Sequence, residues 1–133
     1  MEGKDKFNPC PTVCNICGGT VIFGKMEEFG LEPYQSGYCY HCESCGAYVG
    51  THKNRKKEAL GILAYGDTRY LRSICHQKMD EAYYSRNGRR IAYHVLAREL
   101  GLTKDECHFG HMERDMLERS FAIMSNWKPN QFR

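Results

Sequence analysis

The chain has 133 residues, of which 41% are hydrophobic and 26% charged, a size and balance that fit one soluble globular domain. The net charge of +3 is unevenly distributed: residues 1–50 carry 3 basic and 6 acidic side chains (−3), whereas residues 51–104 carry 12 basic and 5 acidic ones (+7). No apolar run approaches the roughly 18 residues of a membrane span, and the first residues lack the apolar core of a signal peptide, so we expect a cytoplasmic protein without membrane contact.

The first half of the chain predicts an arm followed by a small sheet. Residues 1–11 are polar with two prolines, which indicates an N-terminal arm. Residues 12–52 contain short β-prone runs between turn residues, at 20–23, 38–41 and 47–50. This pattern predicts a small antiparallel sheet around two cysteine turns, a zinc ribbon. The charged residues 53–58 then predict a linker into a helical part that extends over 53–133 of the same domain.

The second half has helical periodicity. Asp67 is the predicted N-cap of a first helix, which residues 86–90 (RNGRR) interrupt, and Gly101 is predicted to end a second helix. Thr103 and Glu106 fit a capping box that starts a short helical turn, and a last helix is predicted from about His111. The apolar stripes of these helices comprise Leu71, Ile74, Cys75, Met79 and Ala82, then Ile91, Ala92, Val95, Leu96 and Leu100, then Met112, Met116, Leu117, Phe121 and Met124.

Eight cysteines are many for a chain without an export signal, and four of them form two Cys-x-x-Cys-Gly turns. We expect Cys14, Cys17, Cys42 and Cys45 to hold one structural zinc ion, because four thiolates close its tetrahedral shell. A four-thiolate iron site fits the same spacing, and a redox role is the other alternative. The neighbouring Cys10, Cys39 and His41 are spare ligands that could replace one of the four, and the sequence leaves the roles of Cys75 and Cys107 open.

Several strings of the chain form a recognisable order: CNICGG, YHCESCGAYVGTH, ALGILA, RYLRSICHQKMD, AYHVLARELGL and ECHFGHM. In this order the chain resembles the zinc-finger-containing domain proteins of phages and bacteria over about residues 12–124. The resemblance implies zinc binding and a mobile-element origin in a bacterial host cell, but no reaction. Where the family pattern has a Pro-Leu-Gly turn, this chain has Ala59-Leu60-Gly61, so we expect a looser turn there.

A second group of polar residues lies at matching positions of the family motif. His76 and Asp80 are four residues apart and share a helix face with Arg72, while His52 and His108 come from other segments. His52, His76, Asp80 and His108 could hold a second metal ion with an open position, as hydrolytic sites do, or one His could serve as general base. The competing interpretation, which we favour, is that they join the two halves structurally.

Basic side chains form two clusters in the middle of the chain. Lys53, Arg55, Lys56 and Lys57 make up the first, and Arg86, Arg89 and Arg90 the second. Tyrosines lie among them, at positions 65, 70, 83, 84 and 93. Basic and aromatic groups together suit nucleic acid, although a solvated face would have the same composition.

Taken together, the sequence predicts an α+β fold, with an N-terminal zinc ribbon packed on a C-terminal bundle of three to four helices. We expect a non-catalytic zinc protein that binds a macromolecule, with nucleic acid as the first candidate and a host protein as the second. The alternative is a metal-dependent hydrolase or nuclease that uses the His52, His76, Asp80 and His108 group. The oligomeric state is left open.

Overall fold

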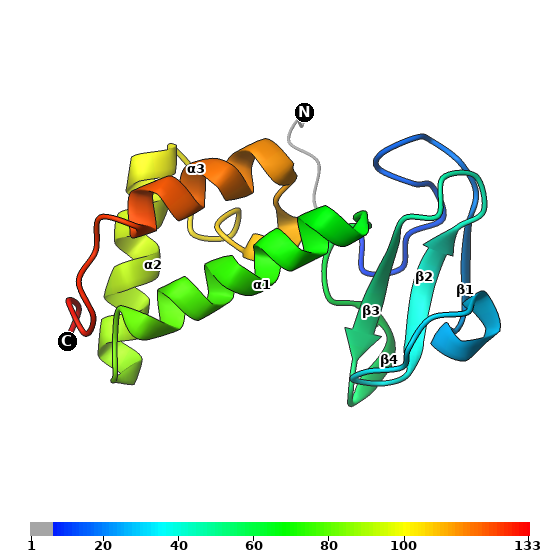
Figure 1. Ribbon diagram of the computed structural model, residues 1–133, viewed down its shortest axis with the longest axis horizontal. Helices are drawn as coiled ribbons and strands as arrows, with labels where there is room; N and C mark the ends of the chain where they lie inside the picture. Colours follow the sequence, from blue (N-terminus) through cyan, green and yellow to red (C-terminus); the bar gives the residue numbers. More distant parts are fainter. Residues whose placement is uncertain (1–6) are drawn as a thin grey trace. The chain divides into compact units, whose positions relative to one another are not determined.

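The computed structural model describes residues 7–133, and over that range the fold is α+β (Figure 1). The chain forms two compact units, one ending at Gly66 and the other beginning at Asp67, and each is described here by itself. Residues 1–6 of the predicted N-terminal arm lie outside the described residues. None of the described helices combines the length and apolar character needed to cross a membrane.

The first unit is built on a four-stranded antiparallel sheet with the strand order β1-β2-β3-β4. Its strands are β1 (Val21–Lys25), β2 (Tyr38–Cys42), β3 (Tyr48–His52) and β4 (Arg55–Ala59). The predicted runs at 20–23, 38–41 and 47–50 correspond to β1, β2 and β3 within two residues. The sheet is therefore held together by hairpins of consecutive strands, the order that short connections favour.

The prediction of a charged linker at 53–58 is wrong, because these residues contribute most of β4. Thr51 pairs with Ala59 and His52 with Arg55, with an irregularity in register between Thr51 and His52. Ala59 is buried in the core, and its N–H donates to the carbonyl of Pro9 over 2.7 Å. Long-range contacts thus impose a strand on a segment whose charged side chains carry no strand pattern.

The sheet has a small core on each face. One face carries Tyr40, Cys42 and Val49 toward a cluster of eight buried residues that also includes Leu63 and Ala59. On the other face the short 3-10 helix η1 (Met26–Phe29) brings the fully buried Met26 over Gly50. A Cβ on Gly50 would lie 3.1 Å from Met26 Cε, so glycine permits this approach.

The second unit consists of α1 (Gly66–Glu81), α2 (Arg86–Leu100), the 3-10 turn η2 (Phe109–His111) and α3 (Arg114–Met124). Asp67 lies inside the first turn of α1 rather than at its N-cap. The predicted interruption at 86–90 is wrong: the Ser85 hydroxyl caps α2 by accepting from the Gly88 N–H over 3.0 Å, so the helix begins at Arg86. Gly101 ends α2 with φ 74°, as predicted.

The segment between α2 and α3 differs from the prediction. Thr103 and Glu106 form both hydrogen bonds of a capping box, with Thr103 N–H donating to Glu106 Oε1 over 2.8 Å and Glu106 N–H donating to Thr103 Oγ1 over 3.3 Å. Residues 104–106 within this box form a turn in place of the predicted helical turn, and η2 follows at Phe109. The last helix begins at Arg114 instead of about His111, and His111 ends η2.

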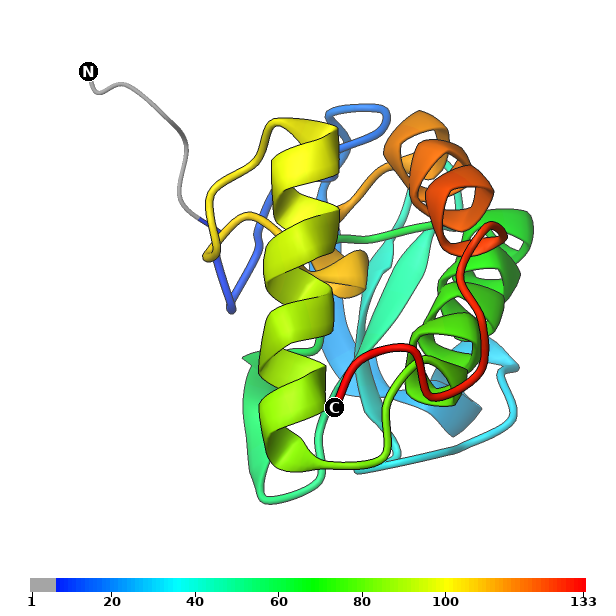
Figure 2. The ribbon, with the colours of Figure 1, turned by 90° about the vertical axis from the view of Figure 1, so that its left-hand side faces the viewer.

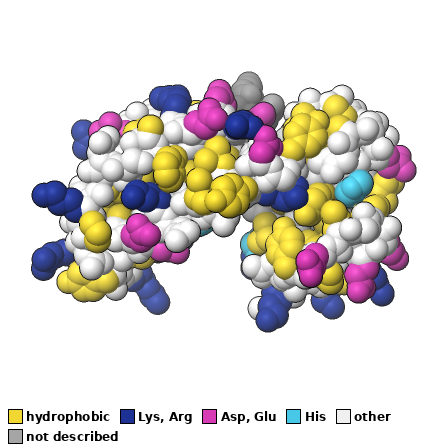
Figure 3. Space-filling view, in the orientation of Figure 1, with side chains coloured by type: hydrophobic (Ala, Val, Ile, Leu, Met, Phe, Trp, Pro, Cys, Tyr) yellow, Lys and Arg dark blue, Asp and Glu magenta, His cyan; other side chains and the backbone are white. Residues whose placement is uncertain are grey.

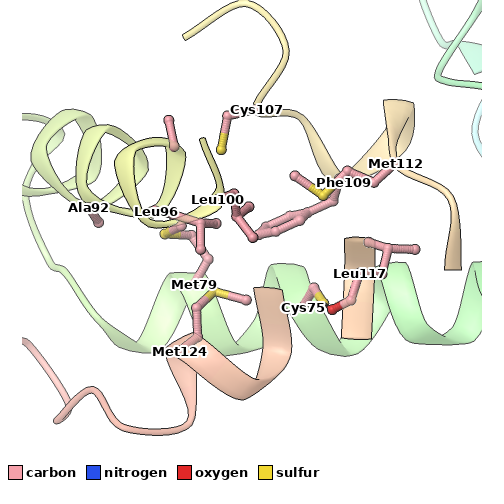
Figure 4. Close-up of a cluster of buried hydrophobic side chains, with 11 residues drawn as sticks. Cys75, Met79, Ala92, Leu96, Leu100, Cys107, Phe109, Met112, Leu117 and Met124 are labelled. Carbon is pink, nitrogen blue, oxygen red and sulfur yellow. Dashed lines mark hydrogen bonds between the residues drawn. The ribbon is translucent and has the colours of Figure 1, made fainter. Parts of the chain in front are cut away.

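The helical unit has one apolar core, to which all three α-helices contribute (Figure 4). Met79, Leu96, Leu117 and Met124 are fully buried, and Phe109 enters from η2. The C-terminal residues close this unit by running back between the end of α1 and the start of α2 (Figure 2), where the Phe132 N–H donates to the Ala82 carbonyl over 2.9 Å. The predicted apolar stripes account for most of this core.

Candidate metal centre

The two Cys-x-x-Cys-Gly turns share one backbone geometry. In each turn the glycine N–H donates to the carbonyl of the first cysteine, over 2.9 Å from Gly18 to Cys14 and 3.2 Å from Gly46 to Cys42. Gly18 and Gly46 have φ values of 79° and 83°, in the left-handed region where a side chain is disfavoured. The glycines predicted to follow each cysteine pair are therefore required by the turns themselves.

The four turn cysteines come together at one point between the two turns. The Sγ atoms of Cys14 and Cys45 are 3.7 Å apart, those of Cys17 and Cys42 are 3.5 Å apart, and all four lie within 4.8 Å of one another. Zinc held by four thiolates at about 2.3 Å forms a tetrahedron with sulfur–sulfur edges of about 3.8 Å. The thiols are free of disulfides, so the donor set and its dimensions fit zinc.

The electrostatics of the cluster favour a cation. A hydrogen bond from the Tyr65 hydroxyl is the main cause that lowers the pKa of Cys45 to about 6. The Gly19 N–H lowers the pKa of Cys17, but hydrogen bonding with Cys42 and the other thiols outweighs it and raises that pKa to about 12. Four thiolates at this spacing cannot all ionise unless a positive charge lies among them. Zinc would supply that charge and, with four protein ligands, would have a closed shell.

The sequence interpretation missed three residues that support this centre. Gly19 lets the turns approach: a Cβ there would lie 2.6 Å from Ser44 Oγ. Asn15 makes two hydrogen bonds with the backbone of Leu63, donating from Nδ2 over 3.0 Å and accepting at Oδ1 over 2.9 Å. Tyr65, two residues after Leu63, is the third, because its hydroxyl bonds to Cys45. The double glycine after Cys17 was a visible signal for close approach, whereas nothing local indicated the partners of Asn15 and Tyr65.

The spare ligands stay outside the cluster. The Cys10 thiol donates to the Lys57 carbonyl over 3.2 Å. Cys39 is fully buried and lies in register between Gly24 and Gly50. The His41 ring stacks on Phe29, with centroids 4.4 Å apart, and burial lowers its pKa. In the helical unit, Cys75 and Cys107 are core residues, and burial raises the pKa of each thiol to about 11.

The second predicted group does not assemble within the helical unit. His76 Nδ1 lies 3.1 Å from the Arg72 carbonyl oxygen, and Asp80 accepts a hydrogen bond from the Tyr83 hydroxyl over 2.8 Å. His108 precedes η2, with its ring 5.0 Å from that of His111. Within residues 7–133, the four cysteines are the one set of three or more Cys, His, Asp or Glu side chains close enough to share an ion. His52 ends β3, in the other unit.

The first basic cluster projects from the β3–β4 hairpin. Lys53, Arg55, Lys56 and Lys57 are all exposed, and Figure 3 shows Lys and Arg side chains protruding at the end of the sheet where β3 turns into β4. Arg55 pairs with the exposed Glu58 over 2.9 Å. Among the described residues, the three lysines form no ion pair, so their charges face solvent.

The second basic cluster occupies the first turns of α2. Arg86, Arg89 and Arg90 are exposed. The Arg89 guanidinium lies 4.9 Å from the centroid of the Tyr93 ring, and Arg90 donates to Asn87 Oδ1 over 2.9 Å. Arg89 and Arg90 therefore have local partners within their own helix.

Comparisons with known proteins agree with the centre. Residues 10–127 match the family model of a zinc-finger-containing domain. No curated protein and no solved structure matches the chain significantly. The family match and the cysteine cluster together support one structural Zn²⁺ held by Cys14, Cys17, Cys42 and Cys45.

Proposed function

The chain belongs to the family of zinc-finger-containing domain proteins, and we propose that it binds nucleic acid through its β3–β4 hairpin inside a bacterial cell, as a phage or mobile-element product. The zinc is structural in this proposal, because four thiolates leave no open position for a substrate or water. The observation that carries it is the hairpin itself. Four exposed cationic side chains stand within five residues, with Lys53 in the β3–β4 turn and Arg55, Lys56 and Lys57 on β4.

The basic hairpin is fixed to the zinc unit rather than loose. The Tyr40 hydroxyl donates to the Lys57 carbonyl over 2.5 Å, and burial helps to raise the pKa of Tyr40 to about 12, which keeps the donor protonated. The buried Ala59 anchors the end of the same strand. Cations held on a rigid strand lose less conformational entropy when they meet a phosphate backbone than cations on a flexible linker.

Salt-dependent binding to DNA and RNA oligonucleotides tests the proposal. Each phosphate contact contributes about 0.9 to the slope of log K against log salt for duplex DNA and about 0.7 for a single strand. Changing Lys53, Arg55, Lys56 and Lys57 to Ala should therefore weaken binding and reduce the slope by about 2 or more. A matched control changes four exposed cations of the helical unit, Arg98, Lys104, Arg119 and Lys128, to Ala. If both variants behave alike, the hairpin is only a solvated surface.

A host protein is the second candidate, and one observation favours it. Val13 and Ile16, beside the first cysteine turn, are 61% and 40% exposed, although apolar side chains of this kind are usually covered. They lie in a part of the chain with an acidic balance, away in sequence from the basic hairpin. If the purified protein binds neither DNA nor RNA, this candidate replaces the first, and Val13→Ser with Ile16→Ser should then weaken binding to the partner.

A further inference from the structure

Three aromatic rings of β1 and β2 contact one another next to the basic hairpin. The rings of Phe23 on β1 and Tyr38 on β2 are stacked, with centroids 5.4 Å apart and planes 6° from parallel. The Tyr40 ring lies 5.1 Å from Phe23 at 52°. Lys56 of β4 completes the arrangement, because its Nζ lies 5.6 Å from the centroid of the Tyr38 ring. The set of Phe23, Tyr38 and Lys56 is called the aromatic platform below.

The strand register explains why these side chains share one face. Phe23 pairs with Tyr40 and Lys25 pairs with Tyr38, so the four side chains project on the same side of the sheet. Phe23 and Tyr38 are then diagonal neighbours, which aromatic side chains can bridge. Phe23 and Tyr38 are both partly exposed, whereas Tyr40 is buried with its hydroxyl bonded to the Lys57 carbonyl. Tyr40 therefore positions β4, while the Tyr38 ring and the Phe23 ring, which also packs against the core of the sheet, are each partly exposed.

Cations lie beside the two rings of the platform. Lys25 is exposed and directly opposite Tyr38 on β1, and Lys56 is exposed on β4. Lys53 and Lys57 extend the positive charge along the hairpin. Partly exposed rings next to cations suit a ligand that alternates flat rings with negative charges, since bases stack on rings while phosphates meet the cations.

We infer that the aromatic platform binds unpaired bases of a single-stranded nucleic acid, with the adjoining phosphates on the hairpin lysines. This inference rests on the proposed nucleic-acid binding and specifies the form of the nucleic acid. In a duplex the faces of the bases are stacked on one another and cannot reach a protein ring, whereas a single strand exposes them. A base that stacks on Tyr38 takes the place of the Lys56 ammonium, which moves to the neighbouring phosphate.

Binding measurements with three probes test the inference. The probes are a DNA strand of about 12 nucleotides, within the range of site sizes of single-strand-binding domains, the RNA of the same sequence, and the DNA duplex. The test variant carries Phe23→Leu and Tyr38→Leu, which keep apolar volume but remove the rings. The matched control is Tyr84→Leu, which removes a 66% exposed tyrosine of the helical unit. Zinc content and thermal melting verify that each variant is folded.

The wild-type chain should bind at least one single strand more tightly than the duplex. The ring variant should lose about fivefold or more of that affinity, at an unchanged salt slope, because stacking involves no phosphate charge. The control should bind like the wild type. Comparing the DNA strand with the RNA strand tells which of the two sources of unpaired bases is preferred.

Photo-crosslinking gives a readout that a merely structural role would not produce. A strand carrying a photoreactive pyrimidine should form its adduct on Phe23 or Tyr38, which peptide mass analysis would locate. Equal affinity for duplex and single strands, or adducts confined to other residues, would overturn the inference while leaving nucleic-acid binding intact. Absence of salt-dependent binding to all three probes would overturn the inference and the proposed function together.

Discussion

A single methyl group at Gly19 should weaken the metal centre. Gly19 is the residue at which the first cysteine turn meets the second: a Cβ there would lie 2.6 Å from Ser44 Oγ, 2.8 Å from Ser44 Cβ and 3.1 Å from Cys42 Sγ. The hydroxyl can rotate away, but Ser44 Cβ is fixed to the backbone of the second turn. Gly19→Ala therefore forces the two turns apart at the place where the ion joins them.

The size of the effect follows from these distances. Ordinary contacts of a Cβ begin near 3.4 Å, so the backbone at Ser44 must move by about 0.6 Å. Overpacking of this kind costs about 1–3 kcal/mol. If the strain is released when the turns separate in the metal-free chain, the whole cost falls on zinc binding, and the dissociation constant rises about 5- to 150-fold.

Competition with a chromophoric chelator measures this change directly. Combining Gly19→Ala with Ser44→Gly removes the two shortest contacts and should restore most of the affinity, whereas Ser44→Gly alone should bind zinc nearly like the wild type because it keeps the N–H that donates to Cys42 Sγ over 3.4 Å. Wild-type affinity of Gly19→Ala would refute the reasoning. So would failure of Ser44→Gly to restore binding, since the steric contact would then not be the cause.

Three further results are expected. Chelation of zinc should abolish amide dispersion of the sheet unit in NMR spectra but keep the helical signal in circular dichroism, because structural zinc supplies about 10–16 kcal/mol and the helical unit has its own core; loss or persistence of both signals would contradict this. Tyr40→Phe should lower the free energy of unfolding by about 1 kcal/mol in denaturant titrations, because it removes the 2.5 Å hydrogen bond to Lys57. Burial, with the nearby charges of His108 and Arg72, lowers the pKa of His111 below 6.5 in the folded chain. As the pH falls, the unfolded chain therefore binds a proton at His111 before the folded chain does. The neutral His111 ring thus contributes fully to stability above pH 6.5, and this contribution is lost as the pH falls through the lowered pKa. Melting curves should therefore show a smaller acid destabilisation in His111→Gln than in the wild type, and equal acid sensitivity of the two proteins would contradict this.

The metal ligands could be predicted because their signal is local. A Cys-x-x-Cys-Gly turn contains both thiols and the left-handed glycine that its own hydrogen bonds require, so each half of the centre is encoded in five residues. The strands β1 to β3 were visible for a similar reason, since β-branched and aromatic residues alternate in them between turns. Which turn meets which, and how closely, depended on Gly19 and Ser44, whose contact links residues 25 positions apart.

The errors arose where a distant contact overrides a local signal. Asn87-Gly88 is typical of a turn, and the pattern at 86–90 therefore predicted an interruption. In the fold, Gly88 serves another purpose: its missing side chain admits the C-terminal segment, since a Cβ would lie 2.5 Å from the Phe132 carbonyl oxygen. Together with the Ser85 cap, this contact makes the segment the first turn of α2. The sequence pattern marked the segment that contains Gly88 but predicted the wrong conformation for it.

The strand β4, which we propose as part of a binding surface, shows why such a surface is hard to predict from sequence. A strand that presents cations to a polyanion cannot also carry the alternating apolar residues that would specify it, so its conformation must be imposed by residues elsewhere. Here those residues are Ala59 at its end and the Tyr40 hydroxyl beneath it, on a sheet whose turns the metal joins. It follows that binding should depend on residues that touch no ligand. Tyr40→Phe, with every lysine intact, should weaken oligonucleotide binding at an unchanged salt slope, because the charges remain but their strand is less firmly held; a variant that binds like the wild type would show that the cations need no such support.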